Sequence, residues 1–157
     1  MSDGASVSRY RLPLALLAVV AVALVISGLN PTDRLTWLLE VFPVLLGFPI
    51  LWATAKRFPL TPLLYVLLAI HALILILGGR YTYAQVPFGF WLQDLFDFAR
   101  NPYDRIGHFA QGFVPAILAR EILLRNRVVD AAKKGWLFYL VVSICLAFSA
   151  CYEFIEW

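Results

Sequence analysis

Five long apolar stretches are the feature that most constrains how this chain can fold. They cover about residues 12–29, 35–53, 60–77, 106–124 and 136–157. A helix needs roughly 20 mostly apolar residues to cross the hydrocarbon core of a bilayer, and each stretch approaches that length. A helix also satisfies its own backbone hydrogen bonds where water is absent. The sequence therefore predicts an all-α polytopic transmembrane helix bundle with five spanning helices.

The composition excludes several other classes of protein. Hydrophobic residues make up 62% of the 157 residues and charged residues only 15%, whereas a soluble domain has about half and a quarter. A soluble globular protein, a disordered chain and a disulfide scaffold are therefore excluded. The net charge of +3 comes from basic residues in the loops rather than along one polar helix face. We therefore expect a lipid bilayer, and no nucleic acid, as the partner.

The segment between the third and fourth spans differs in kind. Residues 80–105 combine eight aromatic side chains with Asp94, Asp97 and Asp104. Residues 88–99 have helical spacing of apolar positions but are too short and too polar to cross a bilayer. Tyrosine and tryptophan favour the depth of the headgroups, and an amphipathic helix there lies in the interface. We therefore expect one interfacial or re-entrant helix over about residues 88–99.

The loop charges predict an orientation. With the N-terminus in the cytoplasm, nine of the 13 basic residues lie on the inner side and four on the outer side, as the positive-inside rule requires. We expect a multi-pass protein of a bacterial inner membrane, with residues 1–157 forming one membrane-embedded domain. The sequence stops at Trp157 in helical rhythm, without a glycine cap or a polar tail. We therefore expect a fragment of a longer protein.

Polar side chains gather at one predicted membrane face. The orientation above places seven acidic or imidazole groups at the outer face, namely Glu40, Asp94, Asp97, Asp104, His108, Glu153 and Glu156. Asp104, His108 and Gln111 have the i, i+4, i+7 spacing of a single helix stripe. Carboxylates with an imidazole suit a divalent metal ion. Asp104 and His108 can also act as a general base and the group that orients it. The convergence of these groups favours a site.

Simpler roles remain open for each residue. Asp104 can cap the fourth span, because a carboxylate stabilises the free N–H groups of a helix start. His108 can hydrogen-bond to a neighbour, and Asp94 and Asp97 can form ion pairs with nearby arginines. Glu153 and Glu156 can belong to an exposed helix end.

Two further charged or polar residues lie outside this cluster. His71 lies in the middle of the third span, where an ionisable side chain is a functional hypothesis by default. The favoured interpretation is a neutral imidazole that hydrogen-bonds to a neighbouring helix. Glu121 is expected to form an ion pair with Arg120 or Arg125 at a helix end.

Several motifs resemble a known family. They are YTYAQVP at residues 81–87, NPYDRIGHFAQGF at 101–113, residues 115–121 and YEFIEW at 152–157. From about Leu35 to its end, the chain resembles the YjdF-like family of bacterial inner-membrane proteins, grouped as a domain of unknown function. The resemblance implies a six-helix protein whose members continue past the last motif through an acidic loop and another helix. It carries six motif positions, without roles: Asp104, Arg105, His108, Gln111, Glu153 and Glu156.

Two functional hypotheses follow from these observations. In the first, the protein is a membrane-embedded hydrolase or transferase acting on a lipid or lipid-linked substrate, and Asp104, His108, Glu153 and Glu156 bind a divalent metal or serve as acid and base. In the second, it is a non-catalytic transporter subunit or membrane assembly factor, because prolines inside the spans and a mid-membrane histidine suit a transport pathway.

Overall fold

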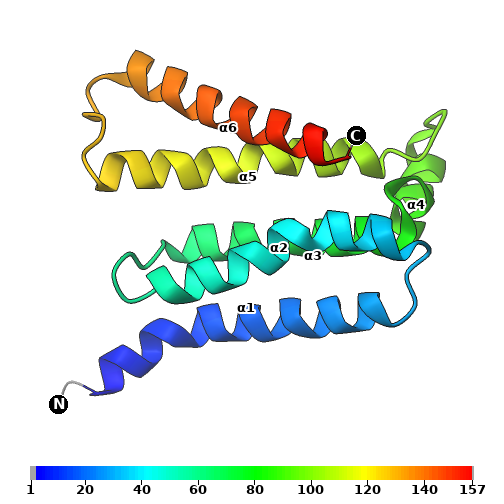
Figure 1. Ribbon diagram of the computed structural model, residues 1–157, viewed down its shortest axis with the longest axis horizontal. Coiled ribbons are helices and arrows are strands. Elements are labelled where there is room, and N and C mark those ends of the chain that lie inside the picture. The colour runs from blue at the N-terminus through cyan, green and yellow to red at the C-terminus, as the bar shows by residue number, and fades with distance from the viewer. Residues whose placement is uncertain (1–2, 157) are drawn as a thin grey trace. The chain divides into compact units, whose positions relative to one another are not determined.

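A computed structural model describes the backbone of residues 3–156 and the side chains of residues 10–152 and Phe154. This part of the chain is helical and contains no strand (Figure 1). Its elements are α1 (Asp3–Leu29), α2 (Arg34–Thr54), α3 (Pro62–Tyr81), the 3₁₀ turn η1 (Tyr83–Gln85), α4 (Pro87–Phe96), α5 (Tyr103–Arg125) and α6 (Lys134–Glu156). The chain divides into two compact units, residues 1–107 and 108–157, and each is described by itself. A single domain therefore stays a prediction.

Four of the described helices are long and apolar enough to cross a membrane. These segments are Tyr10–Leu29, Arg34–Thr54, Pro62–Tyr81 and Lys134–Tyr152. The predicted fourth span is helical in α5 but does not meet the same criterion. Only the 14 residues between Arg105 and Arg120 are free of acidic and basic side chains other than histidine. The all-helical membrane fold is confirmed, whereas the count of five spans stays a prediction.

The starts of α2 and α3 follow directly from their sequences. Asp33 precedes α2 in an extended conformation, and its Oδ1 accepts the Thr36 N–H at 2.7 Å. This hydrogen bond satisfies one of the free N–H groups of the helix start and lowers the pKa of the Asp33 carboxyl. Asp33 is thus the N-cap of α2. Thr61 caps α3 in the same way, followed by Pro62 at the first helical position.

The predicted end of the third span was wrong. The apolar stretch predicted to form this span stops at residue 77, but α3 continues through Gly78 and Gly79 to Tyr81, and Thr82 then adopts a left-handed conformation with φ of 55°. Both glycines serve close packing instead of termination. A Cβ on Gly79 would lie 2.9 Å from the Glu40 Cβ of α2, and one on Gly78 would lie 2.5 Å from the Tyr83 ring. Glu40 therefore lies on α2 where that helix meets α3.

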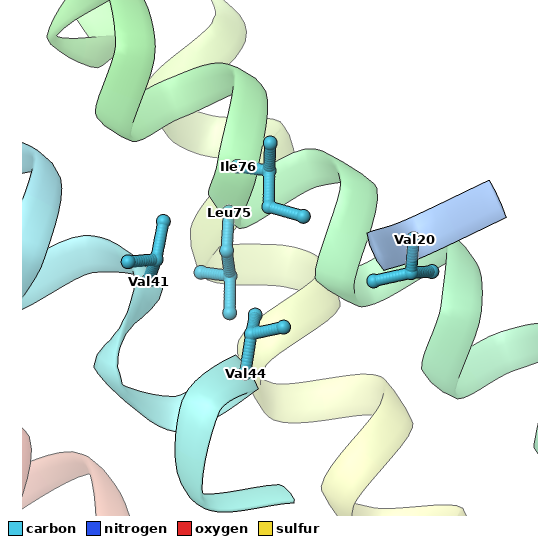
Figure 2. Close-up of a cluster of buried hydrophobic side chains, with 5 residues drawn as sticks. All are labelled: Val20, Val41, Val44, Leu75 and Ile76. Carbon is cyan, nitrogen blue, oxygen red and sulfur yellow. The ribbon is translucent and has the colours of Figure 1, made fainter. Parts of the chain in front are cut away.

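The core of the first unit is a small apolar cluster in the middle of its helices. Figure 2 shows its five side chains, which are Val20 of α1, Val41 and Val44 of α2, and Leu75 and Ile76 of α3. Helix α3 packs against both α1 and α2, whereas those two helices touch each other much less. Helix α3 is therefore the element that holds the first unit together.

Polar contacts join the helix ends at one end of this unit. The Arg80 guanidinium donates to the Ile26 carbonyl at 2.6 Å, and the Arg80 carbonyl accepts from both the N–H and the hydroxyl of Thr32 at 3.0 Å. The Trp37 indole donates to the Ser27 hydroxyl at 2.9 Å. The last carbonyls of a helix lack partners within the helix, and Arg80 supplies one for α1 together with a favourable charge.

Helix α4 is the expected short aromatic helix, with different bounds. It spans Pro87–Phe96, and Asp97 ends it in a left-handed conformation with φ of 52°. The expected helix over residues 88–99 was therefore too long at its C-terminal end. Asp97 does not continue the helix face of Asp94, three residues before it, because Asp97 lies where the helix ends.

An aromatic–amide junction, formed by Tyr83, Val86, Asn101 and Tyr103, ties α3, α4 and the start of α5 together. The Asn101 amide donates to the Val86 carbonyl at 3.0 Å and accepts the Tyr103 N–H at 3.0 Å. The Tyr83 ring lies 5.9 Å from the Tyr103 ring. A Cβ on Gly107 would meet the Tyr83 ring. Tyr103 is only 3% exposed and donates its hydroxyl to the Ile74 carbonyl at 3.1 Å.

The second unit is a helical hairpin made of the remainder of α5 and of α6 (Figure 1). Within it, Arg125 and Glu121 form an ion pair at 2.7 Å with i, i+4 spacing, which confirms the predicted helix-end pair. The connecting loop includes Arg127, which has a φ of 55°. The Ala132 N–H donates to Asp130 at 2.9 Å just before α6 begins.

The packing of this junction predicts that the stability of the protein depends strongly on Gly107. In Gly107→Ala the new Cβ would lie 2.5 Å from Tyr83 Cε1, so the ring has to shift at a cost of about 1–3 kcal/mol. We expect a lower thermal unfolding temperature in detergent, measured by circular dichroism. Gly112→Ala is the matched control, since its Cβ meets nothing within 4 Å and alanine favours helix. Equal unfolding temperatures for the two variants would contradict the packing argument.

Tyr103 predicts a specific loss of stability at high pH. Burial raises the pKa of its phenol to about 12, from an ordinary value of 10. Because the unfolded chain releases this proton first, stability is fully present below pH 10 and is lost as the pH rises toward 12. Tyr103→Phe is expected to lose about 1 kcal/mol at neutral pH with the hydrogen bond to Ile74. It should also show a smaller decline in unfolding free energy between pH 10 and 12 than the parent protein. An identical decline in both proteins would contradict this assignment.

Candidate functional site

A cavity of about 530 Å³ lies within the first unit, beside the aromatic–amide junction. It is lined by Thr82, Tyr83 and Ala84 around η1, Phe90 and Gln93 of α4, Arg100 and Asn101 of the following loop, and Asp104 and Arg105 of α5. Every wall thus comes from the segment that follows α3. Because the junction fixes this segment at several points, it gives the cavity a defined shape.

Two arginines supply the positive charge of the cavity wall. Arg100 lies in the loop that follows α4, and Arg105 lies in the first turns of α5. Both are exposed, and neither forms an ion pair or hydrogen bond with the described side chains. The N-terminus of α5 carries a partial positive charge, which adds to the positive charge of the two arginines. The cavity therefore favours an anionic group.

Asp104 brings a carboxylate into the same wall. It lies in the first turn of α5 and is exposed. Asn101 meanwhile accepts the Tyr103 N–H at this helix start. An anion in the first turn is favourable by itself, so Asp104 combines a helix-stabilising position with access to the cavity. A cavity wall that contains one carboxylate and two guanidinium groups can accept a proton and bind an anion.

Helix α4 and Phe98, which follows it, expose aromatic rings outside the cavity. Phe88 and Trp91 stack at 5.6 Å, and Phe96 and Phe98 stack at 5.7 Å. All four are exposed, as expected of rings that contact lipid near the headgroups. This arrangement favours a cavity at the depth of the lipid headgroups.

The structure brings together some of the predicted site residues of the first unit and not others. Asp104 and Arg105 share the cavity wall, whereas Asp94, Asp97 and Glu40 are not part of it. Asp94 and Asp97 are exposed, and neither pairs with a described basic side chain. The interpretation of these two residues as ion-pair partners is therefore wrong for the described part of the chain.

The other predicted residues fall in the second unit. His108 and Gln111 lie on α5, which is one continuous helix, so they keep their i, i+4 and i+7 spacing from Asp104. His108 is exposed. The side chains of Glu153 and Glu156 lie outside the described residues. The predicted set of Asp104, His108, Glu153 and Glu156 therefore stays a prediction.

The metal hypothesis has no complete ligand set among the described residues. No three histidine, cysteine, aspartate or glutamate side chains of that part gather closely enough to hold a metal ion. The two glutamates that the hypothesis requires are not among the residues searched. Asp104 and His108 are thus the described members of the proposed ligand set.

His71 lines a second, apolar cavity of about 490 Å³ among α1, α2 and α3. Its Nε2 atom is buried and has no hydrogen-bond partner within the described residues, so the expected bond to a neighbouring helix is not formed by this atom. Gly47 of α2 opens the cavity further, because a Cβ there would meet nothing within 4 Å. Lys56 supplies the only formal charge in the lining.

Sequence reasoning missed most of the first cavity's wall, including the polar residues Gln93, Arg100 and Asn101. Arg100 was considered only as an ion-pair partner, and Asn101 and Gln93 were not considered as site residues. A signal was available for Asn101, because an Asn-Pro pair before a helix is typical of a structured turn. Nothing in the spacing of Gln93 and Arg100 indicated that they share a wall, since the left-handed turn at Asp97 brings them there.

Comparison with known proteins places the chain among membrane proteins. Residues 12–157 match the family model "Predicted membrane protein (DUF2238)". The chain is 51% identical over 138 residues to the inner membrane protein YjdF of Escherichia coli (strain K12), covering 88% of this chain and 65% of that protein. It therefore spans about two thirds of that relative's length. No solved structure matches.

The four helices that are long and apolar enough to cross a membrane agree with these similarities. The chain belongs to the DUF2238 family of predicted membrane proteins, and it is a multi-pass protein similar to the inner membrane protein YjdF.

Proposed function

We propose that this protein is a membrane-embedded hydrolase or transferase that acts on a lipid or a lipid-linked substrate. The observation that carries the proposal is the position of Asp104 in the wall of a cavity that also presents Arg100 and Arg105. Such a cavity can bind an anionic group and place a carboxylate beside it. The exposed aromatic rings of α4 support a substrate that reaches the cavity from the headgroup region.

Asp104 and His108 are the proposed acid–base pair. Residues with i, i+4 spacing on a helix lie on the same face, and α5 is helical through both. A carboxylate that orients an imidazole, or accepts a proton through it, contributes about 10²–10⁴-fold to a proton-transfer step. Together with Glu153 and Glu156, the pair has the ligand chemistry for a divalent metal, which would polarise the substrate or its attacking water.

The proposed function includes a transmembrane topology, that is, the number of spans and the side of the membrane on which each segment lies. Five spans, with α5 as the fourth, place the N-terminus in the cytoplasm and the cavity at the outer face of the inner membrane. The loop arginines and lysines support this orientation. A crossing by α5 is supported by its length of 23 residues, because charged residues at its two ends can reach the interfaces.

The apolar cavity around His71 favours a second candidate, a non-catalytic transporter subunit or membrane assembly factor. Its lining comes from three helices of spanning length, and α2 contains Pro43 and Pro49. A buried imidazole without a partner is costly, and in a membrane such a group often marks a pathway. Selective loss of transport or assembly in His71→Leu, together with no lipid turnover by the parent protein, would favour this candidate.

The enzyme proposal predicts a loss of turnover from two substitutions. Asp104→Asn and His108→Ala are each expected to slow lipid conversion by about 10²–10⁴-fold, measured by mass spectrometry of lipid extracts incubated with purified protein. Asp94→Asn is the matched control, since Asp94 is an exposed carboxylate that does not line the cavity. Elemental analysis of the same samples would reveal a metal ion lost with either residue. No turnover by the parent protein on any lipid fraction would refute the proposal.

The proposed transmembrane topology places the two ends of α5 on opposite sides of the membrane. Alkaline phosphatase, which is active only outside the cytoplasm, is fused after Ala99 in one chain and after Asp130 in another. We expect activity from the first fusion and none from the second, because α5 lies between the two points. Equal activity in both would show that α5 does not cross the membrane.

A further inference from the structure

We propose that the cavity beside the aromatic–amide junction binds the phosphate group of a lipid headgroup through Arg100 and Arg105. This inference rests on the proposed function, because it names the substrate class for the same site. It concerns recognition alone, and the proton-transfer residues play no part in it.

The two guanidinium groups are available for a ligand. Both belong to the cavity wall, and neither pairs with a described carboxylate. Arg125, in contrast, pairs with Glu121 at 2.7 Å, so an arginine of this chain does form an ion pair where a carboxylate is in reach. Two unpaired arginines in one wall form a donor set that suits the several acceptor oxygens of a phosphate.

The backbone that carries these arginines is fixed from both sides. Asn101 follows Arg100 directly, and its amide bonds to the Val86 carbonyl and the Tyr103 N–H, each at 3.0 Å. Gly89 of α4 packs directly against the same amide, leaving no room for a side chain. Arg105 lies one residue beyond Asp104 in the first turns of α5. A site on a preorganised backbone loses less entropy when it binds.

The charge of the cavity selects an anion. Asp104 is the one carboxylate of the lining, against two guanidinium groups, so the wall is positive overall. Gln93 adds an amide that can donate a further hydrogen bond. The start of α5 adds N–H groups and a partial positive charge. A neutral diacylglycerol would leave both cations without a partner.

The surroundings of the cavity favour a lipid over free phosphate. Helix α4 forms one wall through Phe90 and Gln93, and it exposes Phe88, Trp91 and Leu95. Exposed aromatic and aliphatic side chains on a short helix are typical of a segment that lies among headgroups. A phosphate carried by a lipid is concentrated at this depth, whereas inorganic phosphate is not.

Native mass spectrometry of the protein in a non-ionic detergent tests this inference. Phosphatidylglycerol is titrated against the whole chain, and diacylglycerol with the same acyl chains is the phosphate-free probe. We expect the parent protein to retain phosphatidylglycerol and not diacylglycerol. The double variant Arg100→Gln/Arg105→Gln should bind phosphatidylglycerol at least about tenfold more weakly, since it loses the charge-assisted hydrogen bonds. Equal retention by the parent and the double variant would overturn the proposal.

Two further variants test whether binding depends on the two cavity arginines rather than on total charge, and a spectroscopic control tests whether the double variant keeps its fold. The variant Arg57→Gln/Arg127→Gln removes the same two positive charges from the loops after α2 and α5, outside the cavity lining, and should leave binding unchanged. Arg105→Lys keeps the charge but loses the planar fork, so we expect an intermediate affinity. A double variant whose helical circular dichroism matches that of the parent has kept its fold. Equal weakening by Arg57→Gln/Arg127→Gln would overturn the proposal in favour of non-specific attraction.

Competition identifies the source of the phosphate, and turnover separates the two proposals. Inorganic phosphate should displace phosphatidylglycerol only at far higher concentration. Displacement at similar concentrations would overturn the lipid assignment.

Asp104→Asn should retain phosphatidylglycerol while losing turnover. Specific binding without turnover by the parent protein would refute the enzyme but keep the phosphate site, whereas turnover that survives in the double variant would refute the phosphate site but keep the enzyme.

Discussion

The hydrogen bonds of one amide group, that of Asn101, hold the candidate site together. Its Nδ2 donates to the Val86 carbonyl before α4, and its Oδ1 accepts the Tyr103 N–H at the start of α5. Gly89 packs against the same amide. The amide thus joins the start of α4 to the start of α5. Arg100 and Asp104, on either side of the junction, take their positions from it.

Several polar groups near the C-terminal end of α3 find hydrogen-bond partners within the protein. The Tyr103 hydroxyl bonds to Ile74, and Arg80 and Thr32 bond to one another and to the end of α1. Buried polar groups are costly without partners. Polar contacts therefore join the helix ends of the first unit, outside its apolar core, and Arg100 and Arg105 form no ion pair or hydrogen bond among the described residues.

Much of this organisation follows from sequence patterns that act locally. The apolar stretches, the cap at Asp33 and the ion pair of Glu121 with Arg125 depend on residues four or fewer positions apart, or on simple length. Errors arose where distant residues decide the outcome. Gly78 and Gly79 do not end α3, because Tyr83 and Glu40 pack on them, and Asp97 turns the chain away from the expected helix face.

The sequence by itself determined that this is a helical membrane protein, because hydrophobicity and helix length act residue by residue. It also singled out Asp104 and Arg105 as candidate site residues. Only the tertiary structure decided that they share a cavity with Arg100 and Gln93, and that Glu40, Asp94 and Asp97 do not line it. The physical reason is that a cavity depends on how η1, α4 and α5 meet, and this follows from the packing of Tyr83 and the amide of Asn101 rather than from spacing along any one helix.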